Sequence, residues 1–112
     1  MLEKVAQIDA YYMSGFASFL DKLAQTQDTD GRSLLDKSMI VYGSGHTDGN
    51  KHSHVNLPII LAGRGGGALT PGRMVKHGNV PTSNLFLTMA DKLGVKCLEK
   101  FGDSTGRITT GL

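Results

Sequence analysis

The chain has 112 residues, a formal net charge of +2 and 39% hydrophobic residues, which suits one domain with a modest core. Its Lys and Arg residues are scattered, so the basic stripe that a nucleic acid backbone requires is missing, and we expect no nucleic acid partner. The single cysteine excludes an intramolecular disulfide, and no apolar run approaches the roughly 18 residues of a membrane span.

The first element that the sequence predicts is a long amphipathic helix over 2–25. Apolar residues recur there at steps of three and four, which places them on one face of a helix. Gly15 weakens the middle of this helix by up to about 1 kcal/mol relative to Ala, and close packing against another element would explain it. Residues 27–33 then have turn chemistry. The predicted buried stripe consists of Val5, Ile8, Tyr12, Phe16, Phe19 or Leu20, and Leu23.

Two short apolar runs, 39–42 and 57–62, are typical of strands that are buried on both faces of an α/β sheet. A glycine-rich segment, 63–68, follows the second run. It matches G-x-G-x-x-A, but the turn at 69–72 replaces the helix that a dinucleotide-binding turn needs. We therefore expect a flexible loop that leads into a short strand or hairpin at 73–77.

The last predicted element is a helix that begins near Thr82 or Ser83, either of which can cap it, and ends at Lys92. Gly94 is well placed as the left-handed residue after its end, and the tail from 101 to 107 should be irregular. The sequence thus predicts an α/β fold, with a partial parallel or mixed sheet of about three strands and two main helices in a single domain over 1–112.

The most site-like stretch is the loop between the two predicted strands, which carries three of the four histidines. In an extended segment His52 and His54 would project to the same side, about 6.6 Å apart at Cα, so both imidazoles could bind one ion. Zinc and similar divalent metals accept imidazole and carboxylate ligands, and Asp48 and His46 lie nearby in the sequence. The alternative is that these groups only hydrogen-bond a polar loop to itself.

Other chemistry-bearing residues carry weaker signals. Ser44 follows a strand end, but its spacing does not match a nucleophile elbow, and no helix follows it. Arg64 and Arg73 could each bind an oxyanion or phosphate, or could simply be solvated. The sequence predicts that His77 lies at the surface and that Cys97 is a small buried residue.

At these residues the chain resembles the C-terminal part of a bacterial family, domain of unknown function 1552. The strings that carry the resemblance are Asp48-Gly49-Asn50-Lys51-His52-Ser53-His54 and Phe101-Gly102-Asp103-Ser104-Thr105-Gly106-Arg107, and the likeness covers essentially the whole chain. That family is similar to the alkaline phosphatase and sulfatase superfamily. Its members are longer, usually exported, and hold metal at the C-terminal ends of a parallel sheet.

The resemblance implies that the chain is the C-terminal portion of an alkaline-phosphatase-like domain. In that superfamily an Asp-His pair and a later histidine bind metal. Here Gly45-His46 stands in the place of the pair, so one carboxylate is missing. The expected ligands for a divalent metal, zinc or manganese, are His46, Asp48, His52 and His54, and Asn50 and Arg64 are expected to contact substrate.

By the same resemblance, the parent protein is expected to be an exported hydrolase of phosphate or sulfate esters, with its nucleophile upstream of Met1. The isolated chain, which has no signal peptide pattern and no assigned catalytic residue, is expected to be inactive. Its partners would be the missing N-terminal part of its own domain and a small phosphate or sulfate ester. Self-association is also expected, because a fragment of a sheet exposes strand edges. The alternative is a non-catalytic relative that binds a ligand or a protein.

Overall fold

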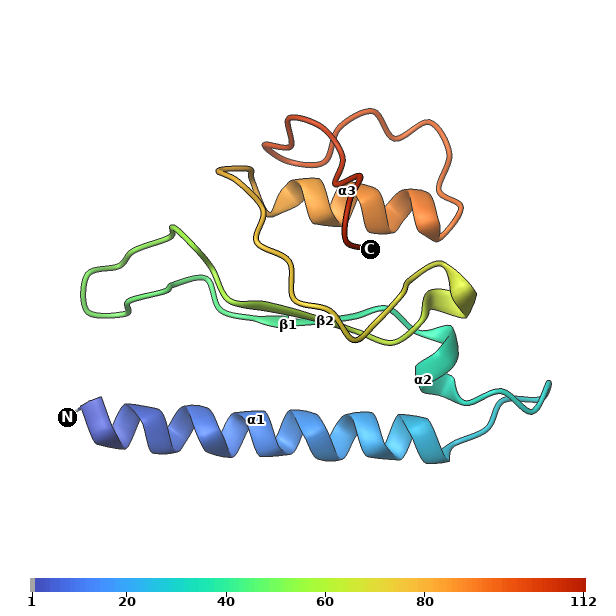
Figure 1. Cartoon of the computed structure of the whole chain (residues 1–112), viewed down its shortest axis with the longest axis horizontal. Coiled ribbons are helices and arrows are strands. Elements are labelled where there is room, and N and C mark those ends of the chain that lie inside the picture. Colours follow the sequence, from blue (N-terminus) through green and yellow to red (C-terminus); the bar gives the residue numbers. More distant parts are fainter. Residues whose placement is uncertain (1) are drawn as a thin grey trace.

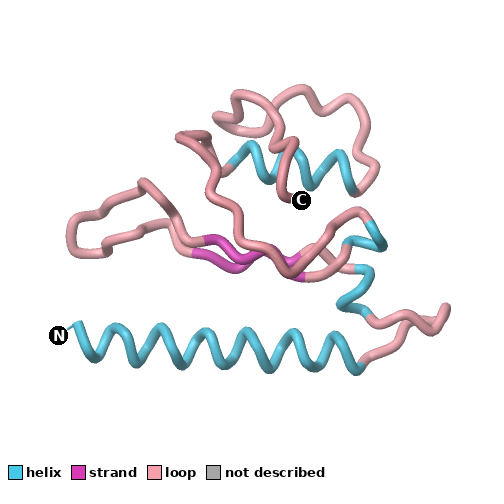
Figure 2. Tube along the Cα trace, viewed as in Figure 1, coloured by secondary structure: helices cyan, strands magenta, loops and turns pink. Residues whose placement is uncertain are grey.

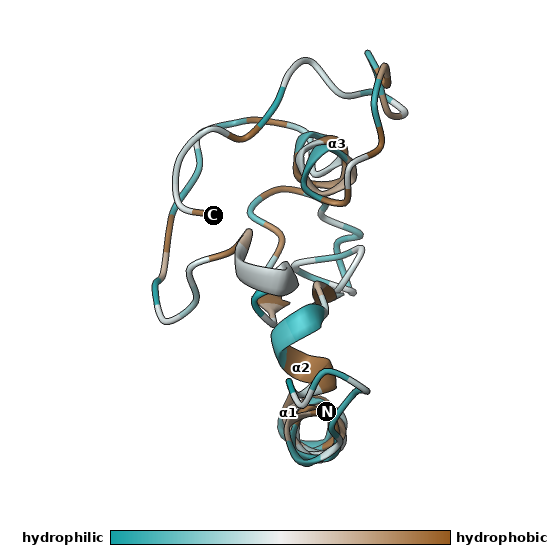
Figure 3. Cartoon of the chain, turned by 90° about the vertical axis from the view of Figure 1, so that its right-hand side faces the viewer, coloured by the Kyte–Doolittle hydropathy of each residue, from teal (hydrophilic) through white to brown (hydrophobic). Residues whose placement is uncertain are grey.

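The computed structural model describes residues 2–112, which form three layers: a long helix, a small sheet and a second helix. The sheet lies between α1 (Leu2–Gln25) and α3 (Ser83–Lys92), an order that is visible from two directions (Figures 1 and 3). The short helix α2 (Leu34–Lys37) and the 3-10 turn η1 (Gly65–Gly67) pack together beside one end of the sheet. The predicted mixture of helices and strands is therefore confirmed.

The sheet has two antiparallel strands, β1 (Ile40–Gly43) and β2 (Ile59–Ala62), in a register that pairs Ile40 with Ala62 and Gly43 with Ile59. This arrangement corrects the predicted direction, because parallel neighbours need a crossover that usually contains a helix. The connection between β1 and β2 is instead a loop without a helix, shown as a long extension in Figure 2. Residues 73–77 form no strand and are largely exposed, so the expected third strand is missing from residues 2–112.

The helix α1 spans the predicted residues, but it buries less than its sequence pattern predicts. None of its residues is fully buried, and Phe16, Leu20 and Leu23 are half-buried. The clearest contact with the sheet is the stacking of Phe16 on Tyr42, with ring centroids 4.6 Å apart. The buried stripe is therefore narrower than predicted, and its other apolar side chains face solvent.

The helix α3 carries most of the core of the molecule. The buried apolar side chains in the described part of the chain are Leu69, Leu85 and Leu87, and Leu87 is fully buried. As predicted, Gly94 adopts a left-handed backbone after the helix, with φ of 81°. Thr82 makes no capping hydrogen bond, whereas the Ser83 hydroxyl donates to Asp103 at 2.5 Å.

The tail 101–108 is irregular, as predicted, and it is held against one face of α3 by side-chain hydrogen bonds. The Asn84 side chain accepts from the Thr105 backbone N–H at 2.9 Å and donates to the Thr105 hydroxyl at 3.3 Å. One turn further along, the Thr88 hydroxyl accepts from the Ile108 N–H at 2.8 Å. Arg107 forms an ion pair with Asp91 beyond that. We call this set of contacts the α3 clamp. Together with the hydrogen bond from Ser83 to Asp103, it explains why the motif from 101 to 107 carries Asp, Thr and Arg.

The chain passes very close to itself where β2 ends. Gly63 has φ of 93°, and a Cβ atom on this residue would lie 2.0 Å from the Ser38 carbonyl oxygen. The next two residues donate backbone hydrogen bonds to the same region, from Gly65 to Ser38 at 2.9 Å and from Arg64 to Leu35 at 3.4 Å. Only glycine fits here, so Gly63 fixes how the segment after β2 crosses the start of β1.

Gly63→Ala should therefore destabilise the fold by about 3 kcal/mol or more, because both the left-handed backbone and the clash with Ser38 oppose a side chain. Gly66→Ala is the matched control, since Gly66 also has a positive φ but has nothing within 4 Å of its would-be Cβ. That control should lose only about 1 kcal/mol. Urea unfolding measures both losses, and equal losses in the two variants would contradict this role for Gly63.

An ion-pair cluster joins the turn after α1 to α2. The Lys37 ammonium lies 2.5 Å from Asp28 and 2.8 Å from Asp30, and its hydrogen bonds hold the pKa of both carboxyls below the ordinary 3.8. Backbone N–H groups of Thr29 and Arg32 lower these pKa values further. Both carboxyls are therefore charged in the folded chain at neutral pH. Their ion pairs with Lys37 hold the turn against α2.

The sign of the resulting pH dependence follows from the lowered pKa values. The stabilisation is fully present above the unfolded-state pKa of 3.8 and is lost as the pH falls through the lower folded-state values. In Lys37→Met the loss of stability between pH 5 and pH 2 should be shallower than in the unsubstituted chain. Thermal unfolding over this pH range measures the difference, with Lys51→Met as the control for removing an exposed charge elsewhere. Parallel acid profiles in all three proteins would contradict the assignment.

Candidate functional site

The candidate site is the loop between β1 and β2, residues 44–58, which we call the histidine loop. It folds back on itself as a small hairpin, because the Thr47 N–H donates to the Ser53 carbonyl at 2.8 Å and the Ser53 N–H donates to the Asp48 carbonyl at 3.1 Å. The turn is closed by Asp48, whose Oδ1 accepts from the backbone N–H groups of Asn50 and Lys51 at 3.0 and 3.2 Å. The hairpin therefore has a defined shape that brings its two arms together.

The two arms of the histidine loop bring three imidazole rings together. The ring centroid of His46, on the first arm, lies 4.4 Å from that of His54 and 5.3 Å from that of His52. The predicted extended geometry is wrong at His52, which has φ of 51° because the turn reaches this residue. His46 is the central ring of the cluster, because it contacts both His52 and His54 of the second arm.

The orientation of His54 is fixed by a hydrogen bond to the backbone. Its Nδ1 lies 2.6 Å from the carbonyl oxygen of Gly45. A carbonyl can only accept, so Nδ1 carries the proton and donates, which leaves the lone pair on Nε2 in the neutral ring. Metal-binding histidines commonly have this arrangement, with one ring nitrogen held by a carbonyl and the other free to bind.

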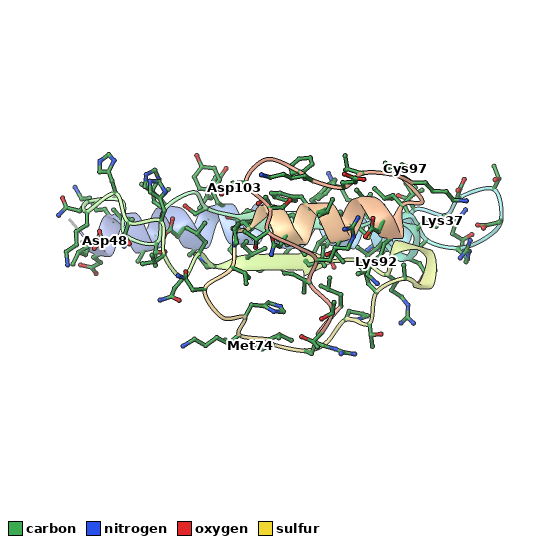
Figure 4. All side chains as sticks on the ribbon, turned by 90° about the horizontal axis from the view of Figure 1, so that it is seen from above. Lys37, Asp48, Met74, Lys92, Cys97 and Asp103 are labelled. Carbon is green, nitrogen blue, oxygen red and sulfur yellow. The ribbon has the colours of Figure 1, made fainter. Side chains whose placement is uncertain are left out.

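The carboxylate and amide that the sequence assigns to the site have other contacts. Asp48 lies at the outer end of the histidine loop (Figure 4), with one oxygen occupied by the turn. Asn50 is exposed, and its backbone N–H is one of the donors to Asp48. Within residues 2–112, no three His, Cys, Asp or Glu side chains are arranged to hold an ion as they stand. Any ion at the histidine loop would therefore require its rings to reorient.

The structure does not bring Arg64 to the histidine loop. Arg64 follows β2, at the end of the sheet where Ile40 pairs with Ala62, whereas the histidine loop extends from the opposite end. Its guanidinium lies 3.3 Å from the Asp36 carboxylate in α2. Contact between Arg64 and a substrate remains a prediction that this position does not support.

The weaker candidates are placed as follows. The Ser44 hydroxyl accepts from the His46 N–H at 3.1 Å, so it shapes the start of the histidine loop. His77 is half-buried in the segment after η1, outside the histidine loop, and Arg73 in the same segment is exposed. Cys97 is exposed and has φ of 67°, which corrects the predicted burial. Cys97 lies in the irregular segment after α3, where Val95 and Lys96 are exposed as well.

Sequence reasoning missed two groups that shape the histidine loop. One is the Gly45 carbonyl, which orients His54, and the other is Thr47, whose hydroxyl donates to the Val55 carbonyl across the hairpin. The glycines at 43 and 45 were the one sequence feature that could have pointed to the Gly45 carbonyl, because a backbone carbonyl is most accessible where the side chains beside it are small. A backbone contact of this kind leaves no pattern in the side chains.

The chain matches no protein-family model, no curated protein and no solved structure. Among the described residues, no helix is both long enough and apolar enough to cross a membrane. The histidine loop therefore has to be interpreted from its own geometry.

The fixed orientation of His54 leads to a direct test. At a pH where the imidazole rings are neutral, long-range proton–nitrogen correlation NMR should show His54 as the tautomer that is protonated on Nδ1. Gly45 cannot be removed as an acceptor by substitution, so His77, which lies outside the histidine loop, serves as the comparison within the same spectrum. Protonation of His54 on Nε2 would contradict the hydrogen bond to Gly45 and the availability of Nε2.

Proposed function

We propose that the histidine loop is part of a divalent-metal site, and that the chain is the C-terminal part of a metal-dependent hydrolase of phosphate or sulfate esters. The observation that carries this proposal is the cluster of three imidazole rings, in which His54 is already oriented by a backbone carbonyl. Three imidazoles are a ligand set that zinc accepts, with a fourth position open for water or substrate.

The spacing of the rings supports this ligand set. Zinc–nitrogen distances of about 2.0–2.1 Å in a tetrahedral site place neighbouring imidazole centroids about 5 Å apart. The two ring pairs that contact each other, His46–His54 and His46–His52, have centroid distances of 4.4 and 5.3 Å, on either side of that value. To share an ion, the exposed rings of His46 and His52 would have to turn toward Nε2 of His54, which the Gly45 carbonyl already holds in place. Asp48 would be a further ligand only through the oxygen that the turn leaves free.

In the parent protein, the bound ion would polarise the ester and stabilise a developing negative charge. This chain would supply the ligands, and its own residues would orient them. The upstream nucleophile and the export of the parent that the resemblance implies belong to this proposal. The open edges of the sheet support it, since β1 and β2 each pair on one side only, and strands of an N-terminal part could extend the sheet on either side.

A second candidate function is a non-catalytic domain that uses the same loop to bind a ligand or a protein. Two observations favour it over catalysis. By the resemblance, Gly45 stands where the alkaline phosphatase and sulfatase superfamily has a carboxylate ligand, and Asp48, the next carboxylate in the sequence, accepts hydrogen bonds within its own turn. Metal affinity would separate a metal site from a purely structural loop, and the presence of an upstream nucleophile would separate the enzyme from the binding domain.

The first experiment is calorimetric titration of the 112-residue chain with zinc and with manganese. We expect saturable binding of one ion per chain, at least tenfold weaker in the His46→Ala/His54→Ala variant, because this pair includes the central ring and the oriented ring. His77→Ala is the control for removing an imidazole outside the loop, and its affinity should match that of the unsubstituted chain. Circular dichroism should confirm that every variant is folded.

Two results would count against the proposal. Equal metal affinity in the double variant and the unsubstituted chain would locate any binding outside the histidine loop. Absence of binding in a folded chain would favour the loop as a structural or protein-binding element. Binding that is confirmed would justify an esterase screen with phosphate and sulfate esters on the full-length parent.

A further inference from the structure

The chain exposes far more surface than a folded protein of its size. A monomer of 12.0 kDa is expected to expose about 6,000 Å², whereas this chain exposes 8232 Å², an excess of about 2,200 Å². A standard protein interface covers only about 800 Å² on each partner. The excess is therefore large enough for at least one complete interface, and its apolar part identifies where that interface lies.

The longest apolar exposure is on α1. Its exposed apolar side chains repeat at steps of three and four along one face, which is the spacing of a helix that packs on another helix. We call this face the α1 stripe. It borders the half-buried residues Phe16, Leu20 and Leu23, and α1 runs along the outside of the molecule (Figure 1). The stripe consists of Val5, Ile8, Tyr12, Gly15 and Phe19, whose four side chains are 48–61% exposed.

Gly15 is the observation that points to a helix as the occupant. A glycine in the middle of a helix costs about 1 kcal/mol relative to Ala, and nothing among residues 2–112 lies within 4 Å of the would-be Cβ of Gly15. The packing that would explain Gly15 is therefore not supplied by the described part of the chain. An open groove of about 410 Å³ runs past this position and is lined by Tyr12, Phe16 and Phe19 of α1 and by Tyr42 of β1.

The order of large and small residues on the α1 stripe favours a second copy of the same helix. When two such helices pack antiparallel about a two-fold axis near Met13–Ser14, Tyr12 of each copy falls opposite Gly15 of the other. In the same register, Ile8 falls opposite Phe19. A two-fold interface must be complementary to itself, and this register satisfies that requirement with a bulky ring over a position that has no side chain.

We propose that the α1 stripe is a two-fold interface between two copies of this chain, with Tyr12 of one copy packed over Gly15 of the other. The inference does not depend on the proposed function, since the histidine loop and the sheet edges take no part in the interface. It gives the expected self-association a defined surface and register. The dimer would bury the aromatic face of α1 and fill the groove beside Tyr42.

The test is analytical ultracentrifugation of the 112-residue chain over a wide range of concentrations. We expect a monomer–dimer equilibrium, and Gly15→Leu should raise its dissociation constant at least tenfold because the new side chain occupies the position of Tyr12. Leu is a better helix former than Gly, so the helix content and thermal stability of the monomer should not fall. Ala17→Leu is the matched control, because it adds the same side chain to an exposed position on the opposite face of α1.

A compensating variant tests the register itself. Tyr12→Ala/Gly15→Leu replaces the large–small pair by a small–large pair, so the double variant should dimerise more tightly than Gly15→Leu alone. A chain that stays monomeric at every concentration would overturn the proposal. So would self-association that Gly15→Leu and Ala17→Leu change equally, or a double variant that recovers nothing.

Discussion

The antiparallel pairing of β1 with β2 positions the histidine loop at one end of the sheet and the crossing at Gly63 at the other. Because Gly43 pairs with Ile59, the residues between them must leave and re-enter the sheet at the same end. The chain can do this only by folding back as a hairpin, and that hairpin brings His46 beside His52 and His54. At the other end of the pair, the same register delivers Gly63 against Ser38, and this close approach sets the path toward α3. A loop of the same composition between strands in a different register would not bring the same rings together.

Polar contacts hold much of this fold, because its apolar core is small. Leu69, Leu85 and Leu87 are the buried apolar residues of the described chain, while Ser83, Asn84, Thr88 and Ser104 are buried to a similar degree. A buried polar group is costly unless it has a partner, and throughout residues 2–112 every buried side-chain nitrogen and oxygen has one. In the C-terminal half, the contacts of the α3 clamp thus hold the tail on the helix, a role that apolar packing has in larger domains. The clamp also restricts which residue can stand at position 84. A side chain of another shape would leave the Thr105 N–H without its acceptor and the Thr105 hydroxyl without its donor.

Periodicity in the sequence predicted both main helices and the positions of both strands, because these patterns report directly on local backbone geometry. The direction of the strands could not be predicted this way, since a short apolar run is the same in a parallel and an antiparallel pair. The histidine cluster was predicted from residue types, but its geometry was not. His52 adopts a left-handed backbone, and His54 is oriented by the carbonyl of Gly45, a contact that no side-chain pattern records. The burial of α1 was overestimated for a related reason, because an amphipathic pattern shows which face is apolar and not whether anything covers it.

The α3 clamp has a consequence for how the chain opens. It ties the C-terminal segment to α3 through Asn84, Thr88 and Asp91, while α1 is attached to the rest mainly through α2 and the stacking of Phe16 on Tyr42. The two ends of the chain therefore belong to different cooperative units. Transient detachment of α1 leaves α3 and its clamp intact, whereas release of the tail exposes polar groups that only the tail can satisfy. We therefore expect amide protons of α1 to exchange with solvent through a small local opening, and those of α3 to exchange only when a larger part of the fold is lost.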